Sequence, residues 1–432
     1  MKRKLIAAIG VAGMMVSIAA CGSDSDTGSK DGAKPSAGES KNLTVWVMDG
    51  SAPQTWIDGV NKEFEAKHPG VKVKVETQQW TDIQTKVTTA LSEDTPPDVL
   101  ELGNTQTTGY AASGGLADLT GDKDKLGYAG WSEGIKPSAE LEGKLYAAPW
   151  WAANRVVIYD KAAYKKAGVT PPKTRAEWIE GLKKLKAADP KGQPIYLPGQ
   201  SWYVLAGLIW DEGGDLAVKD GDKWKGTLGT PQAAAAMNFY KELQSYSTGP
   251  KDKDEATPQQ SVDVVPKGGV ASWIGLGWEA GGAVAELEKA GKKADFGYFP
   301  IPGKTADKPG SVFFGGSNLA IAERSQNKEL AKEWLALAVG KKQMAEYGKA
   351  NKGGIIPNDP SAQFQPEAGS FAEAMVKAAS TGKITPVTEG WANVETAPNP
   401  IKDYMTKVLK GEDAQKAGEA ADKVITERIN QQ

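Results

Sequence analysis

Aromatic and amide side chains recur in this chain at the ends of predicted strands. Examples are Asp49-Gly50, Asn104-Thr105-Gln106 and Trp202-Tyr203. In an open α/β sheet, ligands bind outside the carboxyl ends of the strands. A sugar ring has one C–H-rich face that packs on an indole, and its hydroxyls both donate and accept hydrogen bonds, which suits neighbouring Asp, Asn and Gln side chains. The chemistry predicted for these positions is therefore carbohydrate binding.

The chain has 14 tryptophans and only 8 phenylalanines, an inversion of the usual order that favours a role for flat aromatic surfaces. Core packing is the alternative for every tryptophan, and we prefer it for those inside periodic elements: Trp46, Trp56, Trp178 and Trp334. We expect ligand contacts from Asp49, Gly50, Trp80, Asn104, Thr105, Gln106, Trp150, Trp151, Asn154, Gln200, Trp202, Tyr203, Trp273, Trp278, Glu279, Gly316, Ser317, Asn318 and Trp391.

Motifs for catalysis are scarce in the sequence. The single histidine, His68, lies in a turn sequence beside Pro69, so no Ser-His-Asp arrangement is available. Neither HExxH nor a Cys/His zinc spacing occurs, and no cofactor or metal is expected. Two alternatives to a binding protein remain: a secreted glycoside hydrolase that uses Glu279 with Asp49 or another acid, and a surface scaffold without a small ligand.

The N-terminus has the layout of a secretory signal. Three basic residues, Lys2 to Lys4, precede an apolar run from Leu5 to Ala20, and the next residue, Cys21, is the only cysteine. Ile18-Ala19-Ala20-Cys21 resembles the lipobox of bacterial lipoproteins, in which the cysteine is acylated. We expect a signal peptide over 1–20, a lipidated flexible tether over 21–41, and a protein held by lipid at the extracellular face of the membrane. With a formal net charge of −2 and no basic stripe, nucleic acid is not an expected partner.

From Leu43 onward, patterns typical of strands and helices alternate, which predicts an α/β fold. The first α/β unit has predicted strands at 43–48, 71–75 and 98–102, a helix marked by Trp56, Val60 and Phe64, and a helix over 81–92. The second unit has predicted strands at 155–159, 194–197, 269–274 and 296–299, and helices over 175–188, 231–244 and 279–290. A strand over 318–322 and mostly helices follow, at 328–339, 341–349, 371–379, 401–409 and 414–429, with Trp391 in a loop.

Several stretches, in this order behind a lipobox, make the chain similar to the solute-binding proteins of carbohydrate ABC importers, of the maltodextrin-binding type. They include Leu43-Thr44-Val45-Trp46, Pro96-Pro97-Asp98-Val99, 143–149 (GKLYAAP), 156–161 (VVIYDK), 315–321 (GGSNLAI) and 328–335 (KELAKEWL). The sequences 46–51 (WVMDGS), 103–106 (GNTQ) and 251–260 (KDKDEATPQQ) look closest to streptomycete lipoproteins that bind N,N′-diacetylchitobiose.

This resemblance implies a two-lobed periplasmic-binding-protein fold of type II, with discontinuous lobes joined by hinge strands. The implied lobes are 42–152 with 314–361, and 153–313 with 362–432. It also implies a monomer that carries an oligosaccharide to ABC permease subunits and has no enzymatic activity. Where maltodextrin binders have a carboxylate near the hinge, this chain has Ala153 or Asn154, and this departure argues against maltose itself. The alternatives to a chito-oligosaccharide are another disaccharide, namely cellobiose, maltose or xylobiose.

Overall fold

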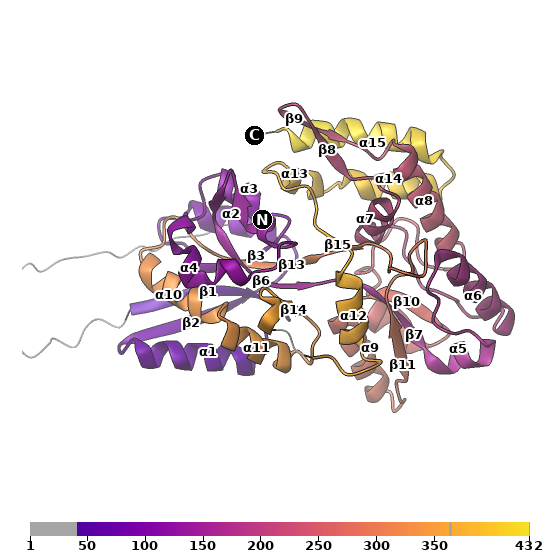
Figure 1. The fold of residues 1–432 in the computed structure, drawn as a ribbon, viewed down its shortest axis with the longest axis horizontal. Coiled ribbons are helices and arrows are strands. Elements are labelled where there is room, and N and C mark those ends of the chain that lie inside the picture. Colours follow the sequence, from indigo (N-terminus) through magenta and orange to yellow (C-terminus); the bar gives the residue numbers. More distant parts are fainter. Residues whose placement is uncertain (1–40, 363–364, 432) are drawn as a thin grey trace, which may run out of the picture. The chain divides into compact units, whose positions relative to one another are not determined.

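The largest sheet has six strands in the order β14–β6–β13–β3–β1–β2 (Figure 1). It belongs to a computed structural model that describes residues 41–362 and 365–431. Its parallel part consists of β1 (Lys41–Met48), paired with β2 (Val71–Gln78) on one side and β3 (Val99–Gly103) on the other. In β2, Val71, Val73 and Val75 alternate with charged residues, as expected for a strand with one covered face.

The other half of this sheet comes from later parts of the chain. β13 (Gly315–Ile321) runs antiparallel between β3 and β6 (Ala147–Ala153), and β14 (Ile356–Pro357) is antiparallel to β6. Because two segments distant in sequence return to the sheet, the simple series of α/β units read along the chain does not describe it.

Helices cover both faces of the sheet. α1 (Gln54–Lys67) and α11 (Lys341–Ala350) lie on one side in Figure 1, and α2 (Ile83–Ser92) and α3 (Thr107–Ala112) lie on the other. α10 (Lys328–Ala338) packs against α1 and α11. The buried face of α1 carries Trp56, Val60 and Phe64, which confirms the predicted spacing.

A second sheet has three strands, with β7 (Val156–Asp160) in the centre and β10 (Ser272–Gly275) and β11 (Phe296–Phe299) antiparallel to it. The strand predicted over 194–197 is wrong. That segment makes only isolated bridges, such as Tyr196 with Trp273, because it touches the sheet without extending along it.

The helices around the second sheet agree with most of the predicted spans. α6 (Arg175–Ala188) begins at a capping box in which Thr174 and Glu177 satisfy each other's backbone N–H groups. The loop predicted at Trp391 is wrong, because a short helix, α13 (Trp391–Glu395), begins there. The remaining helices of this group are α5 (Lys161–Ala167), α7 (Trp202–Asp211), α8 (Pro231–Gln244), α9 (Gly277–Lys289), α12 (Phe371–Ala379), α14 (Pro400–Leu409) and α15 (Ala414–Ile429).

Two chain segments connect the six-stranded sheet directly to strands outside it, one in the second sheet and one in a small separate sheet. β6 continues through Asn154 and Arg155 into β7, and β12 (Val312–Phe313) continues through Phe314 into β13. β12 pairs in parallel with β15 (Gly382–Lys383). The smaller elements are α4 (Lys123–Leu126), the pair β4 (Glu140–Leu141) and β5 (Lys144–Leu145), and the hairpin of β8 (Ala217–Asp220) and β9 (Lys223–Gly226). Among the described residues, no helix has both the length and the apolar character needed to cross a bilayer.

Candidate functional site

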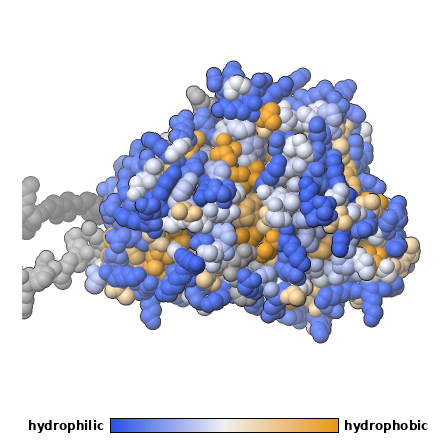
Figure 2. Space-filling view, viewed as in Figure 1, coloured by the Kyte–Doolittle hydropathy of each residue, from blue (hydrophilic) through white to orange (hydrophobic). Residues whose placement is uncertain are grey.

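A cavity of about 1020 Å³ opens where β1, β2 and β3 end, and residues that follow all three strands line it. Segments from the second sheet's side complete the lining, at the beginning of α7, α9 and α12. In the space-filling view, hydrophobic side chains gather along the middle of the face, between hydrophilic surroundings (Figure 2). A cavity at the carboxyl ends of parallel strands is the expected place for a small ligand in an α/β fold.

Hydrogen bonds to Glu101 on β3 fix the loop after β1. Glu101 is fully buried and accepts hydrogen bonds from the Met48 N–H at 2.7 Å and from the Ser51 hydroxyl at 2.7 Å. Burial raises the pKa of Glu101 to about 7, because the charged form loses its hydration. Gly50 has a φ of +76°, which glycine adopts without strain. The loop is thus fixed with the Asp49 side chain exposed at the cavity.

The turn after β3 carries Asn104, Thr105 and Gln106 at the cavity. The Asn104 side-chain amide donates to the carbonyl oxygen of Phe314 at 3.1 Å, and its backbone N–H donates to Gly316 at 3.0 Å. These bonds tie the turn to the connection between β12 and β13. The turn's position therefore depends on a segment about two hundred residues later in the chain.

Two tryptophans at the cavity stay unusually exposed, Trp80 at 44% and Trp278 at 50%. They are the only aromatic residues among the exposed large hydrophobic side chains of the described part of the chain. Trp278 meets Trp151 edge-on, with ring centroids 5.9 Å apart. Exposed indoles at a concave surface carry an unfavourable hydration that a bound apolar face would relieve.

Another part of the cavity lining is built on Tyr203 and Arg155. The Tyr203 ring stacks on Phe313 with centroids 4.4 Å apart, and the Arg155 guanidinium lies 5.0 Å from the Tyr203 centroid. Arg155 also forms an ion pair with Glu255, whose other oxygen accepts from the Ser201 hydroxyl at 3.0 Å. The side chains of Arg155 and Glu255 are only 11% and 18% exposed, so this pair fixes the wall in a largely water-free setting.

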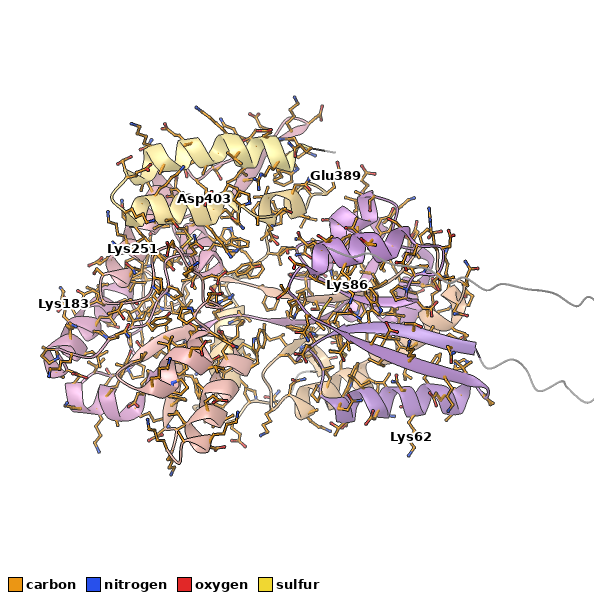
Figure 3. All side chains as sticks on the ribbon, turned by 180° about the vertical axis from the view of Figure 1, so that it is seen from behind. Lys62, Lys86, Lys183, Lys251, Glu389 and Asp403 are labelled. Carbon is orange, nitrogen blue, oxygen red and sulfur yellow. The ribbon has the colours of Figure 1, made fainter. Side chains whose placement is uncertain are left out.

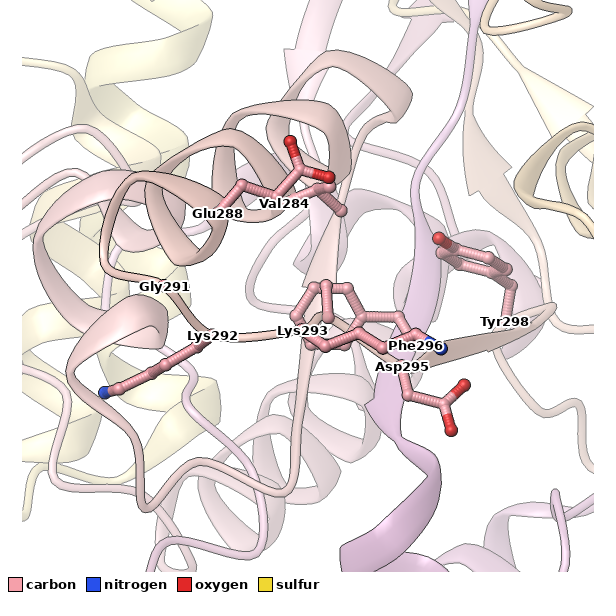
Figure 4. A pocket seen from close by; sticks show the side chains of 9 residues that line it. Val284, Glu288, Gly291, Lys292, Lys293, Asp295, Phe296 and Tyr298 are labelled. Carbon is pink, nitrogen blue, oxygen red and sulfur yellow. The ribbon is translucent and has the colours of Figure 1, made fainter.

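A smaller hollow of about 540 Å³ adjoins the cavity and shares Val284, Glu288 and Tyr298 with it (Figure 4). Lys292, Lys293 and Asp295 complete its polar rim. Charges of both signs at this rim favour neither an anion nor a cation. Within the described residues, no cluster of His, Cys, Asp and Glu could hold a metal ion.

Comparison with known proteins decides the family. A family model described as bacterial extracellular solute-binding protein matches residues 49–345. The chain is also 52% identical, over 434 aligned residues and 100% of both chains, to the diacetylchitobiose binding protein DasA of Streptomyces coelicolor. The chain belongs to the bacterial extracellular solute-binding proteins.

Solved structures agree on the fold. The GacH receptor of Streptomyces glaucescens has a TM-score of 0.75 at 22% identity, over 90% of this chain and 98% of that one. The sugar-binding protein MalE of Xanthomonas citri has a TM-score of 0.76 at 21% identity, over 90% and 97%. The predicted two-lobed α/β fold is confirmed by these neighbours, and family membership makes the chain a binding protein and not an enzyme.

The structure of this solute-binding protein brings many of the predicted residues together at one cavity. These are Asp49, Gly50, Trp80, Asn104, Thr105, Gln106, Trp151, Tyr203, Trp278, Gly316 and Ser317. They come from seven separate stretches of the chain, so only the fold assembles them.

Four predicted tryptophans do not line the cavity. Trp150 and Trp151 are neighbours on β6, so their side chains point to opposite faces of the strand. Trp150 is fully buried between Trp56 and Tyr347, at centroid distances of 5.4 and 5.1 Å. The other three pack inside the protein: Trp202 behind Tyr203, Trp273 against Phe296, and Trp391 with its Nε1 donating to Glu395.

Of the predicted polar residues outside the cavity lining, Glu279, Asn318 and Gln200 have structural hydrogen-bond partners instead. Both oxygens of Glu279 accept hydrogen bonds, from the Gln260 amide and from the Leu276 N–H, each at 2.9 Å. Burial raises the pKa of Glu279, and as the third residue of α9 it accepts from the backbone N–H of the N-cap residue Leu276, as the glutamate of a capping box does. Asn318 donates to Thr107 and Ser138, Gln200 donates to Thr406, and Asn154 is buried between the two sheets.

Sequence reasoning missed several residues at the cavity. Arg155 follows Asn154 directly, and its charge at the start of the predicted strand 155–159 was the available signal. Phe313 and Tyr298 lie in short strands that look like ordinary core. The turn at Asn351-Lys352 and the start of α12 at Ser370-Phe371 carry no local signal except their glycines, because helices α11 and α12 bring them to the cavity only in the folded chain.

Proposed function

We propose that this protein captures N,N′-diacetylchitobiose, or a short chito-oligosaccharide of the same kind, and delivers it to an ABC permease. The observation that carries the proposal is the cavity, in which the exposed indoles of Trp80 and Trp278 stand beside the Asn104 and Gln106 side chains. The indoles offer apolar faces for the sugar rings, and amide groups pair with acetamido groups and hydroxyls. The identity to the diacetylchitobiose binding protein DasA supports this choice of sugar.

Ligand capture in our proposal closes the two lobes on the sugar. A saccharide between Trp80 and Asn104 on one wall and Trp278 and Tyr203 on the other makes more contacts in a closed form than in an open one. Its binding therefore shifts the population toward closure, and the permease recognises the closed form. The connections from β6 to β7 and from β12 to β13 would serve as hinges between the lobes. One lobe would consist of residues 42–152 and 314–361, and the other of residues 153–313 and 362–432.

Membrane attachment is part of the same proposal. Cys21, which lies outside the described residues, would carry the lipid, and residues 21–41 would form the tether. A monomer on such a tether stays within reach of the permease, because the anchor raises its effective concentration at the membrane. The anchor would hold the protein at the extracellular face of the cell membrane.

Isothermal calorimetry of the purified protein with N,N′-diacetylchitobiose, cellobiose, xylobiose and maltose tests the choice of ligand. We expect N,N′-diacetylchitobiose to bind most tightly. Cellobiose has the same linkage without acetamido groups, so it is the matched control and should bind at least tenfold more weakly. Equal or tighter binding of cellobiose or maltose would show that the amides at the cavity do not select acetamido groups. If none of the sugars raised the melting temperature of the protein, that result would contradict saccharide binding itself.

A further inference from the structure

The turn of Asn104 to Gln106 is tied to a segment almost three hundred residues later. The Thr105 hydroxyl donates to a carboxylate oxygen of Glu395, at the end of α13, over 2.9 Å. Glu395 does not line the cavity, although Thr105 does. This carboxylate therefore acts on the cavity through another residue.

The second oxygen of Glu395 contacts a series of aromatic residues that ends at the cavity. It accepts from the Trp391 indole N–H at 2.8 Å. The fully buried Trp391 lies 6.4 Å from Trp202, whose ring lies 3.9 Å from Tyr203. Because Tyr203 lines the cavity, one carboxylate connects the turn after β3 with the aromatic wall on α7.

The bond between Thr105 and Glu395 is one of several contacts between residues 388–396 and the helices α2 and α3 with the turn before α3. We call these contacts together the joint. The Thr108 hydroxyl on α3 donates to the Thr388 carbonyl oxygen at 3.0 Å, and Thr396 donates to Gln84 at 3.3 Å. A Cβ added to Gly109 would lie 3.2 Å from the Glu389 carbonyl oxygen, so the backbones are already close. Figure 3 shows Glu389 where the segment before α13 approaches the helices of the first sheet.

The surroundings of Glu395 fit a carboxyl group withdrawn from water. Burial raises its pKa to about 7, against the hydrogen bonds from Trp391 and Thr105 and the charge of Lys402 on α14, which lower it. Tyr203 on α7 and Gln106 on the turn also face this group. A glutamine at this position reproduces the neutral form, and its amide can accept from Trp391 while it donates to the Thr105 oxygen.

We infer that Glu395 is a positioning residue for the cavity: it fixes the Asn104–Gln106 turn against the Tyr203 wall and thereby sets saccharide affinity without contacting the saccharide. The inference rests on the proposed function only for the choice of probe. The geometry of the joint is a property of the unliganded chain.

Calorimetry with N,N′-diacetylchitobiose tests this role in folded variants. We expect Glu395→Ala to weaken binding at least tenfold and Glu395→Gln to remain within threefold of the wild type. Asp422→Ala is the matched control, because Asp422 also joins distant segments, accepting from the N–H groups of Leu228 and Gly229 at 2.6 and 2.8 Å, but lies away from the cavity. It should lower the melting temperature and leave the affinity unchanged.

A double-mutant cycle with Thr105→Val separates the joint from direct contacts of Thr105 with sugar. If Thr105 and Glu395 act as one unit, the double variant binds no more weakly than Glu395→Ala alone. Three outcomes would each overturn the inference. The losses of affinity in the two single variants could add strictly in the double variant, Glu395→Ala could leave the affinity unchanged, or Asp422→Ala could weaken binding as much as Glu395→Ala does.

Hydrogen exchange of the unliganded protein gives a readout that does not depend on the sugar. Glu395→Ala should increase amide exchange in the peptide that covers 104–112, whereas Glu395→Gln and Asp422→Ala should not. If the wild type bound none of the sugars, the proposed function would fail while this measurement still decided the role of Glu395. Unchanged exchange in Glu395→Ala would refute it.

Discussion

Trp278 offers the sharpest test of saccharide stacking in the cavity. A tryptophan side chain buries up to about 250 Å² when fully covered, and Trp278 is 50% exposed. A sugar ring that covers one face removes roughly half of that exposed area, about 60 Å², from water. At about 25 cal/mol per Å² this contributes about 1.5 kcal/mol, which is roughly tenfold in affinity.

Trp278→Ala should therefore raise the dissociation constant for N,N′-diacetylchitobiose at least tenfold in calorimetry. The dissociation constant of Trp278→Phe should lie between those of the wild type and Trp278→Ala, because a smaller ring keeps part of the stacking face. Trp224→Ala, which changes a tryptophan of β9 outside the cavity, is the matched control and should bind normally. Unchanged affinity in Trp278→Ala would remove this residue from the site and refute the stacking argument.

Three further predictions concern stability and attachment. Glu101→Gln should unfold with the wild-type free energy near pH 4.5 and become more stable than the wild type by about 3 kcal/mol near pH 8. The reason is that Glu101 has a pKa of about 7 in the folded wild type, above its usual value, so the stability of the wild type falls as the pH rises from about 4.5 to 7. Urea unfolding at a series of pH values measures this difference. Parallel stability profiles of the two proteins would contradict the prediction. Arg155→Ala should lower the free energy of unfolding by about 3 kcal/mol, because it leaves Glu255 largely buried without its partner. Denaturant titration checks this, and Arg155→Ala combined with Glu255→Gln should recover part of the loss. Cys21→Ser should abolish incorporation of labelled fatty acid and release the protein from the membrane fraction, and retained label would place the lipid elsewhere.

Local sequence patterns were sufficient for most helices and for the strands with a strong apolar signal. The helix face of Trp56, Val60 and Phe64 and the alternation of Val71, Val73 and Val75 both appear in the structure as predicted. Such patterns record which side of an element is buried, and that side is a local property. The segment over 194–197 misled because an apolar run reports burial and not membership in a sheet.

The choice among tryptophans could not be made in the same way. Trp150 and Trp151 have the same chemistry and adjacent positions, yet only Trp151 reaches the cavity. Strand geometry sends one of two neighbours to each face, and which face is concave depends on segments elsewhere in the chain. Trp391 was equally plausible from its sequence, and the fold buries it beside Trp202, away from the cavity lining, instead.

The sequence alone predicted an α/β fold and sugar binding, and the order of stretches such as 315–321 and 328–335 resembled the solute-binding proteins, because these patterns are properties of the chain itself. Tertiary structure decided which of the candidate residues meet. Glu279 changed from a candidate ligand into a helix cap, and Arg155 became part of the cavity wall. The physical reason is that exposure at a concave surface is set by packing between segments far apart in sequence, as the contact of Thr105 with Glu395 illustrates.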